Sequence, residues 1–353
     1  MTLTEYLGEI RPLDQNAADL AQKRWDSIAK PLGSLGKLET AVIQIAGLTG
    51  SADVSISKRC VLVFCADNGV VAQGVTQSGQ EITAVVSENF TRGDTSVCAM
   101  ARAAGAEVVP VDIGIAREMK VPGLIDRKVR FGTADMTEGP AMTREEAEKA
   151  VLTGMEMVRR LKEEGYGIIA TGEMGIGNTT TSSAVVSVLM NKPVEEVTGR
   201  GAGLDSAGLG RKIRAIRKAI EVNRPDPADP MDILCKVGGL DIAGIAGAFL
   251  GGAVYRVPVV VDGLISAAAA LIAARLCPAA KCAMLASHVS AEPAGRMLLD
   301  ELGLSPMITA DMCLGEGTGA VALFPLLDMG IAVYREMNTF DQNRMEAYTH
   351  FDD

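Results

Sequence analysis

The chain has 353 residues, of which 48% are hydrophobic, and a formal net charge of -10 from 34 basic and 44 acidic side chains. This length and composition are typical of a soluble globular protein with one large domain or two unequal ones. The negative charge, without a basic cluster, argues against nucleic acid and against anionic membrane surfaces as partners. Small phosphorylated molecules remain possible ligands despite the negative net charge, because backbone amides and one or two local cations can hold a phosphate.

The first 50 or so residues favour helices interrupted at residues 30–39, and they contain the single tryptophan, Trp25. We expect residues 1–55 to form a small helical subdomain that residues 328–353 complete, including the acidic end at residues 351–353.

Short apolar runs rich in β-branched residues then recur, each followed by an acid or a glycine, at residues 60–66, 107–111, 167–171 and 257–261. A capping box, Thr143 with Glu146, starts an amphipathic helix between the second and third runs, and Gly165 ends it. Apolar strands that alternate with helices predict an α/β fold: a Rossmann-like parallel sheet flanked by helices over residues 56–327. Ligands of such sheets bind at the carboxyl ends of the strands.

Two long uncharged apolar runs, residues 242–255 and 263–274, are too short to span a bilayer and are expected to be interior helices. The seven cysteines are scattered without C-x-x-C spacing, which indicates free thiols. The polar, acidic N-terminus resembles no secretory signal, so we expect a cytoplasmic protein without a membrane partner.

Metal and triad chemistry are poorly supported, since the chain has only two histidines, His288 and His350. We expect no metal ion and no cofactor. His288 is the one plausible member of a Ser-His-Asp triad, but no G-x-S-x-G motif accompanies it. A histidine hydrogen-bonded in a polar loop is the simpler interpretation.

A first candidate site lies at residues 171–182, where a strand meets a helix. It offers Glu173, bare backbone and hydroxyl donors for an anion, at Gly175, Ile176, Gly177, Asn178 and Thr179. Asn178 is the expected N-cap. The lysine of a P-loop is absent, which favours a monophosphate over ATP. A glycine turn chosen only for packing explains these residues equally well.

Two further segments carry possible site residues. Gly201 and Gly203 lie in a glycine-rich loop upstream of Lys212, although a loop before an ordinary solvated basic helix is the competing interpretation. Glu316 lies between Gly315 and Gly317 just before an apolar stretch. Such a turn could place a base beside bare backbone, or it could be a strand-to-helix turn with a solvated glutamate.

A set of motifs occurs in order along the chain, at residues 31–39, 66–75, 111–114, 139–143, 172–180, 238–243, 261–263, 287–293 and 314–320. Together these motifs resemble the nicotinate-nucleotide–dimethylbenzimidazole phosphoribosyltransferase family over essentially the whole chain. The resemblance implies a glycosyltransferase that moves 5-phosphoribosyl from nicotinate mononucleotide to 5,6-dimethylbenzimidazole, giving α-ribazole 5′-phosphate and nicotinate with inversion at C1′. It also implies a homodimer and a role in cobalamin nucleotide-loop assembly.

Residue by residue, the resemblance makes Glu316 the catalytic base and places Glu173 and Lys212 near the phosphoribosyl group. Residues 175–179 are then expected to hold the 5′-phosphate with Gly201 and Gly203 beside it, and Gln80 to line the benzimidazole pocket. Asp241, Val289 and Asp135 depart from the family pattern. Benzimidazole, adenine or a phenol therefore stay open as acceptors, and a non-catalytic phosphoribosyl-nucleotide-binding regulator is the alternative function.

Overall fold

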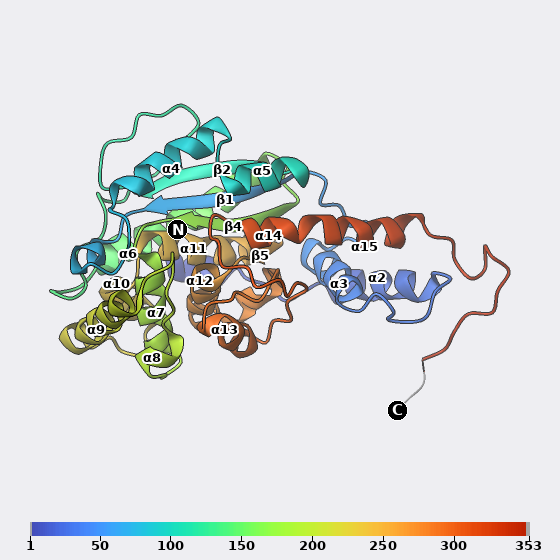
Figure 1. Cartoon of the computed structure of the whole chain (residues 1–353). Helices are drawn as coiled ribbons and strands as arrows, with labels where there is room; N and C mark the ends of the chain where they lie inside the picture. Colours follow the sequence, from blue (N-terminus) through green and yellow to red (C-terminus); the bar gives the residue numbers. More distant parts are fainter. Residues whose placement is uncertain (1, 351–353) are drawn as a thin grey trace.

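A parallel six-stranded sheet forms the centre of the protein (Figure 1). The computed structural model describes residues 2–350. The strands are β1 (Arg59–Ala66), β2 (Glu107–Gly114), β3 (Ile125–Asp126), β4 (Ile168–Met174), β5 (Val259–Val261) and β6 (Met284–Ala286). Their order in the sheet is β3-β2-β1-β4-β5-β6, and every neighbouring pair is parallel. The predicted α/β class is therefore confirmed.

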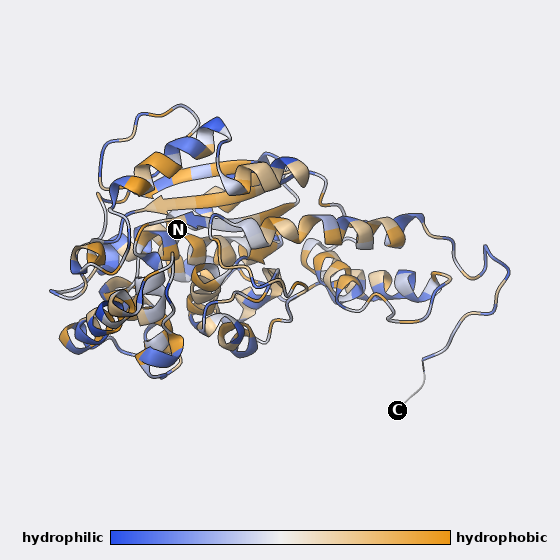
Figure 2. Cartoon of the chain, in the orientation of Figure 1, coloured by the Kyte–Doolittle hydropathy of each residue, from blue (hydrophilic) through white to orange (hydrophobic). Residues whose placement is uncertain are grey.

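Alternate side chains of each strand enter two different hydrophobic cores, because successive residues of a strand point to opposite faces. On β1, Leu62 and Phe64 join the core on one face, while Val61 and Val63 join the core on the other. Both sets are fully buried, which explains why β1 has a continuous apolar sequence and appears as one hydrophobic ribbon in Figure 2.

Helices cover both faces of the sheet. The first core contains side chains of α6 (Arg144–Glu163), α7 (Asn178–Leu189), α9 (Ser206–Asn223), α10 (Pro230–Val237), α11 (Leu240–Tyr255), α12 (Leu264–Leu276) and α13 (Ala294–Leu302), with α1 (Leu3–Leu7) at its edge. The second contains side chains of α2 (Gln15–Ser27), α3 (Lys37–Thr49), α4 (Glu81–Arg92), α5 (Ser96–Ala103), α14 (Thr318–Ala322) and α15 (Phe324–Glu336). The short elements are α8 (Val194–Val197), η1 (Gly69–Gln73) and η2 (Pro278–Ala283).

The predicted strands all occur, and the short strands β3 and β6 were not among them. The capping box at Thr143 is present at the start of α6, whose regular structure ends at Glu163, two residues before Gly165. The two apolar runs are the interior helices α11 and α12, as expected.

A helical cluster of α2, α3 and α15 lies beside the sheet (Figure 1). The Trp25 ring packs on Tyr334 with 5.1 Å between ring centroids, and Arg24 Nε donates to the Tyr334 carbonyl at 2.9 Å. Because these helices share the second core with the sheet, the subdomain boundaries at 55/56 and 327/328 stay a prediction. The predicted packing of residues 351–353 lies outside the described residues.

The segment Thr318–Glu336, which includes α14 and α15, is long and apolar enough to cross a membrane by length and composition alone. However, 56% of its most apolar window is buried inside the protein, where Val321, Phe324 and Leu327 belong to the second core. Packing within the fold therefore accounts for its apolar character.

Helices α6 and α11 approach each other closely because glycines face the contact. A Cβ atom on Gly247 would lie 1.9 Å from the Val151 carbonyl oxygen, and one on Gly154 would lie 2.0 Å from the Gly244 carbonyl oxygen. Both obstructing atoms are backbone, so a side chain there would force the helices apart.

Gly247→Ala is expected to lower the free energy of unfolding by about 2–3 kcal/mol, because the added methyl overpacks the helix interface. The matched control is Gly210→Ala in α9, where the nearest atom to a Cβ belongs to the flexible Arg214 side chain at 3.4 Å. That variant should gain roughly 0.5–1 kcal/mol from helix propensity. Urea denaturation of both variants measures the difference, and equal stabilities would contradict the packing argument.

Candidate active site

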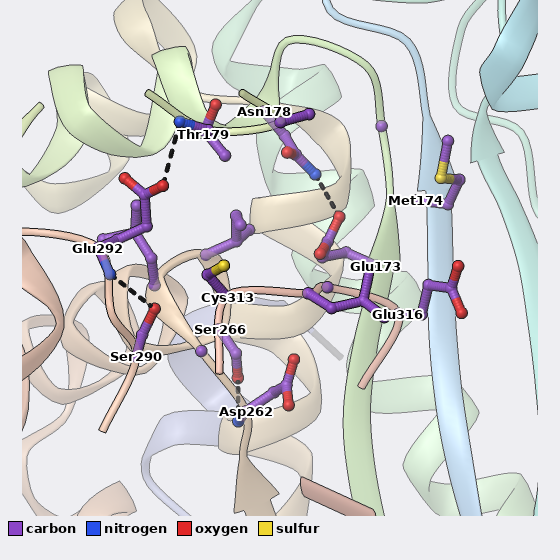
Figure 3. A pocket seen from close by; sticks show the side chains of 18 of the residues that line it. Glu173, Met174, Asn178, Thr179, Asp262, Ser266, Ser290, Glu292, Cys313 and Glu316 are labelled. Atoms are coloured by element: carbon purple, nitrogen blue, oxygen red, sulfur yellow. Dashed lines mark hydrogen bonds between the residues drawn. The ribbon is translucent and has the colours of Figure 1, made fainter. Parts of the chain in front are cut away.

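A pocket lies at the carboxyl ends of β4, β5 and β6, beside the point where the strand order reverses between β1 and β4. This pocket has a volume of about 240 Å³. Five segments form it: the end of β4 with the following turn, the loop at Gly201 and Ala202, the start of α12, the stretch after β6, and the turn before α14. Figure 3 shows the side chains that line it.

Glu316 lies in the turn before α14 with a left-handed backbone, φ 65°, which is uncommon for a residue with a Cβ. Its backbone packs against Gly172 of β4, where a Cβ would lie 2.4 Å from the Glu316 carbonyl oxygen. Oε2 of Glu316 accepts a hydrogen bond from the Val97 N–H of α5 at 2.9 Å. In Figure 3 the Glu316 and Glu173 carboxylates project to opposite sides of the turn.

Asp262, directly after β5, holds the same turn. Its Oδ1 accepts the Ala320 N–H at 2.8 Å, and the N–H groups of Gly317 and Gly319 contribute to the same cluster of donors. Burial raises the pKa of Asp262 to about 7, and these backbone N–H groups act in the opposite direction. A buried carboxylate thus anchors the segment that presents Glu316.

Glu173 is linked through Asn178 to a second buried acid. Nδ2 of Asn178 donates to Glu173 and also to Asp241 Oδ2, the latter at 3.0 Å. Burial, followed by the nearby Asp241 charge, raises the pKa of Glu173 well above its ordinary value, and burial raises the pKa of Asp241 to about 6. The prediction of Asn178 as N-cap is wrong: Gly177, with φ 94°, occupies that position, which frees the Asn178 amide for the two carboxylates.

The two predicted glycine segments meet at Lys212. Its Nζ donates to Thr179 Oγ1 at 2.8 Å and to the Gly199 carbonyl at 3.1 Å, and its side chain is fully buried. A Cβ at Gly201 would lie 3.4 Å from Nζ. Burial lowers the Lys212 pKa to about 8. A cation therefore lies directly behind the wall that Thr179 and Gly201 form.

The structure brings most of the predicted residues to this pocket, whose lining includes Glu173, Gly175, Ile176, Asn178, Thr179, Gly201, Gly315 and Glu316. Gly177 and Gly317 support the two turns as left-handed residues, and Gly203 accepts a hydrogen bond from Gln77 in the adjoining loop. Gln80 does not line the pocket: its Nε2 donates to the Asn68 carbonyl at 3.0 Å. Its predicted contact with the acceptor stays a prediction.

The lining also contains residues that were not predicted as site residues, among them Met174, Asp262, Ser266, His288, Ser290, Glu292 and Cys313. Asp262 had a usable signal, because it follows a predicted strand as Glu173 does. His288 is buried, its Nδ1 lies 3.0 Å from Ser287 Oγ, and burial lowers its pKa. Among residues 2–350, no three His, Cys, Asp or Glu side chains are grouped to hold a metal ion.

The raised pKa of Asp262 predicts a pH-dependent stability. Between its unfolded pKa, near 3.8, and about 7, the folded state retains a proton that the unfolded state has lost, so stability falls as pH rises through this window. The contribution is at most about 1.4 kcal/mol per pH unit. Asp262→Asn should therefore show a smaller loss of unfolding free energy between pH 5 and pH 8 than the wild type.

Chemical denaturation at a series of pH values measures this slope, to which Asp241 and Glu173 add in the same direction in both proteins. Asp300→Asn, at an exposed position, is the control for the same change of net charge. If its slope matched that of Asp262→Asn, burial of Asp262 would not be the cause.

Comparison with known proteins agrees with this geometry. A family model described as "Phosphoribosyltransferase" matches residues 10–345. Two relatives named nicotinate-nucleotide–dimethylbenzimidazole phosphoribosyltransferase, from Ruminiclostridium cellulolyticum and Geobacter metallireducens, are 47% and 46% identical over 348 and 345 residues, covering 99% and 98% of both chains in each pair. The crystal structure of CobT from Thermus thermophilus superposes with a TM-score of 0.89 at 40% identity, covering 94% of this chain and 99% of that one.

These matches extend over nearly the full length of both partners and include the segments that form the pocket. The chain belongs to the nicotinate-nucleotide–dimethylbenzimidazole phosphoribosyltransferase family.

Proposed function

We propose that this protein transfers 5-phosphoribosyl from nicotinate mononucleotide to a ring nitrogen of 5,6-dimethylbenzimidazole in cobalamin nucleotide-loop assembly. The products are α-ribazole 5′-phosphate and nicotinate, with inversion at C1′. The observation that carries the proposal is the pairing, in one pocket, of Glu316 on its glycine turn with a glycine and threonine cradle backed by Lys212.

The reaction itself requires neither a metal nor a nucleophilic side chain. Nicotinate leaves from a pyridinium nitrogen that is already positive, so its departure requires no general acid. As one nitrogen of the acceptor attacks C1′, the N–H on the other nitrogen becomes acidic and needs a base. We assign Glu316 to that proton. We assign the acceptor to the α5 side of the turn, where the Val97 N–H binds Oε2 of this carboxylate.

Glu173 is assigned to the ribose side of the pocket. Burial favours its protonated form in the ligand-free protein. The cationic pyridinium of the donor would lower the pKa of Glu173 again and favour its carboxylate form. This carboxylate would then stabilise the positive charge that develops on the ribose as the C1′ bond loosens. Asn178 holds this carboxyl in place.

The 5′-phosphate is assigned to the turn at Gly175, Ile176, Gly177, Asn178 and Thr179, with Gly201 and Gly203 beside it. Backbone N–H groups at the start of α7 and the Lys212 charge would stabilise it together. Because pocket shape and a few polar groups set which base is accepted, related benzimidazoles remain candidate acceptors.

We also propose that the protein acts as a homodimer in the cytoplasm. Exposed apolar side chains on the α2 and α15 cluster, at Leu20, Met329 and Met337, are available for a subunit contact. The cysteines are free thiols, which suits a reducing compartment.

Incubation of the purified protein with nicotinate mononucleotide and 5,6-dimethylbenzimidazole should yield α-ribazole 5′-phosphate, detected by mass spectrometry. Glu316→Gln should lower kcat about 10²–10⁴-fold, because the amide cannot take the proton. Glu336→Gln, at an exposed position, is the matched control. No product from the wild type would refute the transferase and leave the regulatory binding protein, whereas a fully active Glu316→Gln would refute only the choice of base.

Lys212→Met should raise the KM for nicotinate mononucleotide about 10–100-fold by removing a charged partner of the phosphate. Lys212 is charged below its pKa of about 8, so the wild-type KM should rise as pH passes through 8, and the KM of the variant should lack this rise. Lys218→Met, on the exposed side of the same helix, is the control. Steady-state kinetics from pH 6.5 to 9.5 test this prediction, and a pH rise retained in Lys212→Met would contradict it.

A further inference from the structure

Glu292, in the stretch between β6 and α13, extends its carboxylate into the phosphate cradle. Its Oε1 accepts the Gly201 N–H at 3.1 Å. Its Oε2 is buried and has no hydrogen-bond partner among residues 2–350. In Figure 3 the side chain lies next to Thr179, on the opposite side of the pocket from Glu173 and Glu316.

The space for this carboxylate depends on a glycine. A Cβ on Gly199 would lie 1.8 Å from Glu292 Oε2 and 2.7 Å from Pro293 Cδ. The backbone at Gly199 also supplies the carbonyl that binds Lys212 Nζ. The carboxylate is therefore enclosed by the same loop that encloses the cation.

The position of Glu292 resembles that of a bound anion. A backbone N–H binds one oxygen, the other oxygen is buried without a partner, and the negative charge lies close enough to Lys212 to raise its pKa against the effect of burial. Within residues 2–350, Lys212 donates hydrogen bonds to two neutral oxygens, Thr179 Oγ1 and the Gly199 carbonyl. A phosphate at this place would share the Gly201 N–H with a like charge, which is unfavourable in a desolvated pocket.

We propose that Glu292 is an internal stand-in for the phosphate: its carboxylate occupies the Gly201 N–H in the ligand-free protein and is displaced when the donor's 5′-phosphate enters. This inference rests on the proposed function, from which the phosphate subsite is taken. It makes Glu292 a residue that weakens donor binding, in contrast to Lys212 and the glycine turns. The Glu292 carboxylate keeps the Gly201 N–H hydrogen-bonded until the substrate phosphate replaces this carboxylate.

Glu292→Gln tests the inference, because glutamine retains an acceptor for the Gly201 N–H and removes the charge. Its dissociation constant for inorganic phosphate, measured by isothermal titration calorimetry, should fall about tenfold relative to the wild type, as expected for loss of a nearby like charge. The dissociation constant for nicotinate mononucleotide should fall in the same direction. Glu301→Gln makes the same change of net charge at an exposed ion pair with Arg275 and should leave both constants unchanged.

If Glu292 instead bound the ribose or only held the loop in place, Glu292→Gln would bind the ligand more weakly than the wild type. Unchanged or weaker phosphate binding by Glu292→Gln would therefore overturn the inference, as would a phosphate-bound crystal structure in which Glu292 Oε1 still accepts the Gly201 N–H. Absence of phosphate binding by either protein at millimolar concentrations would also overturn it. These readouts involve no turnover, so a failure to form α-ribazole 5′-phosphate would refute the proposed reaction separately.

Discussion

The active-site geometry depends on the contact between the buried Asp262 carboxylate and the amide groups at the start of α14. This contact joins the end of β5 to the turn that carries Glu316, and the turn in turn packs its backbone on Gly172 of β4. Two strand ends thereby hold a residue with a strained, left-handed backbone. The hydrogen bonds within the turn, from Thr318 to the Leu314 and Gly315 carbonyls, are supplemented in this way by a buried acceptor from another strand.

Acidic and basic side chains are unevenly distributed around the pocket. Glu173, Asp262 and Glu316 lie toward the sheet, whereas Lys212 lies behind the two glycine segments, with the Glu292 carboxylate near it. A donor with a cationic ring at one end and a phosphate at the other matches this distribution when the phosphate displaces Glu292. The raised pKa values of the buried acids are the cost of such an arrangement in a ligand-free site, and a cationic substrate offsets part of it.

Glycine has two distinct uses around the site. At Gly177 and Gly317 it permits the left-handed turns from which α7 and α14 begin. At Gly172 and Gly199 it leaves room for the backbone of Glu316 and the carboxylate of Glu292. The second use is not visible in a sequence pattern, because the neighbour that fills the space comes from a distant segment.

The sequence by itself determined the fold class, because continuous apolar strands, capping residues and helical periodicity are local properties that survive in any context. It also pointed to Glu316 and the glycine turns, because the order of these motifs along the chain resembles that of the family. Only the tertiary structure decided what holds them. Asp262 binds an amide 58 residues away, Glu292 one 91 residues away and Glu316 one 219 residues away. Such partners are set by the order of strands in the sheet, which places segments far apart in the chain at one edge, and no local pattern encodes that order.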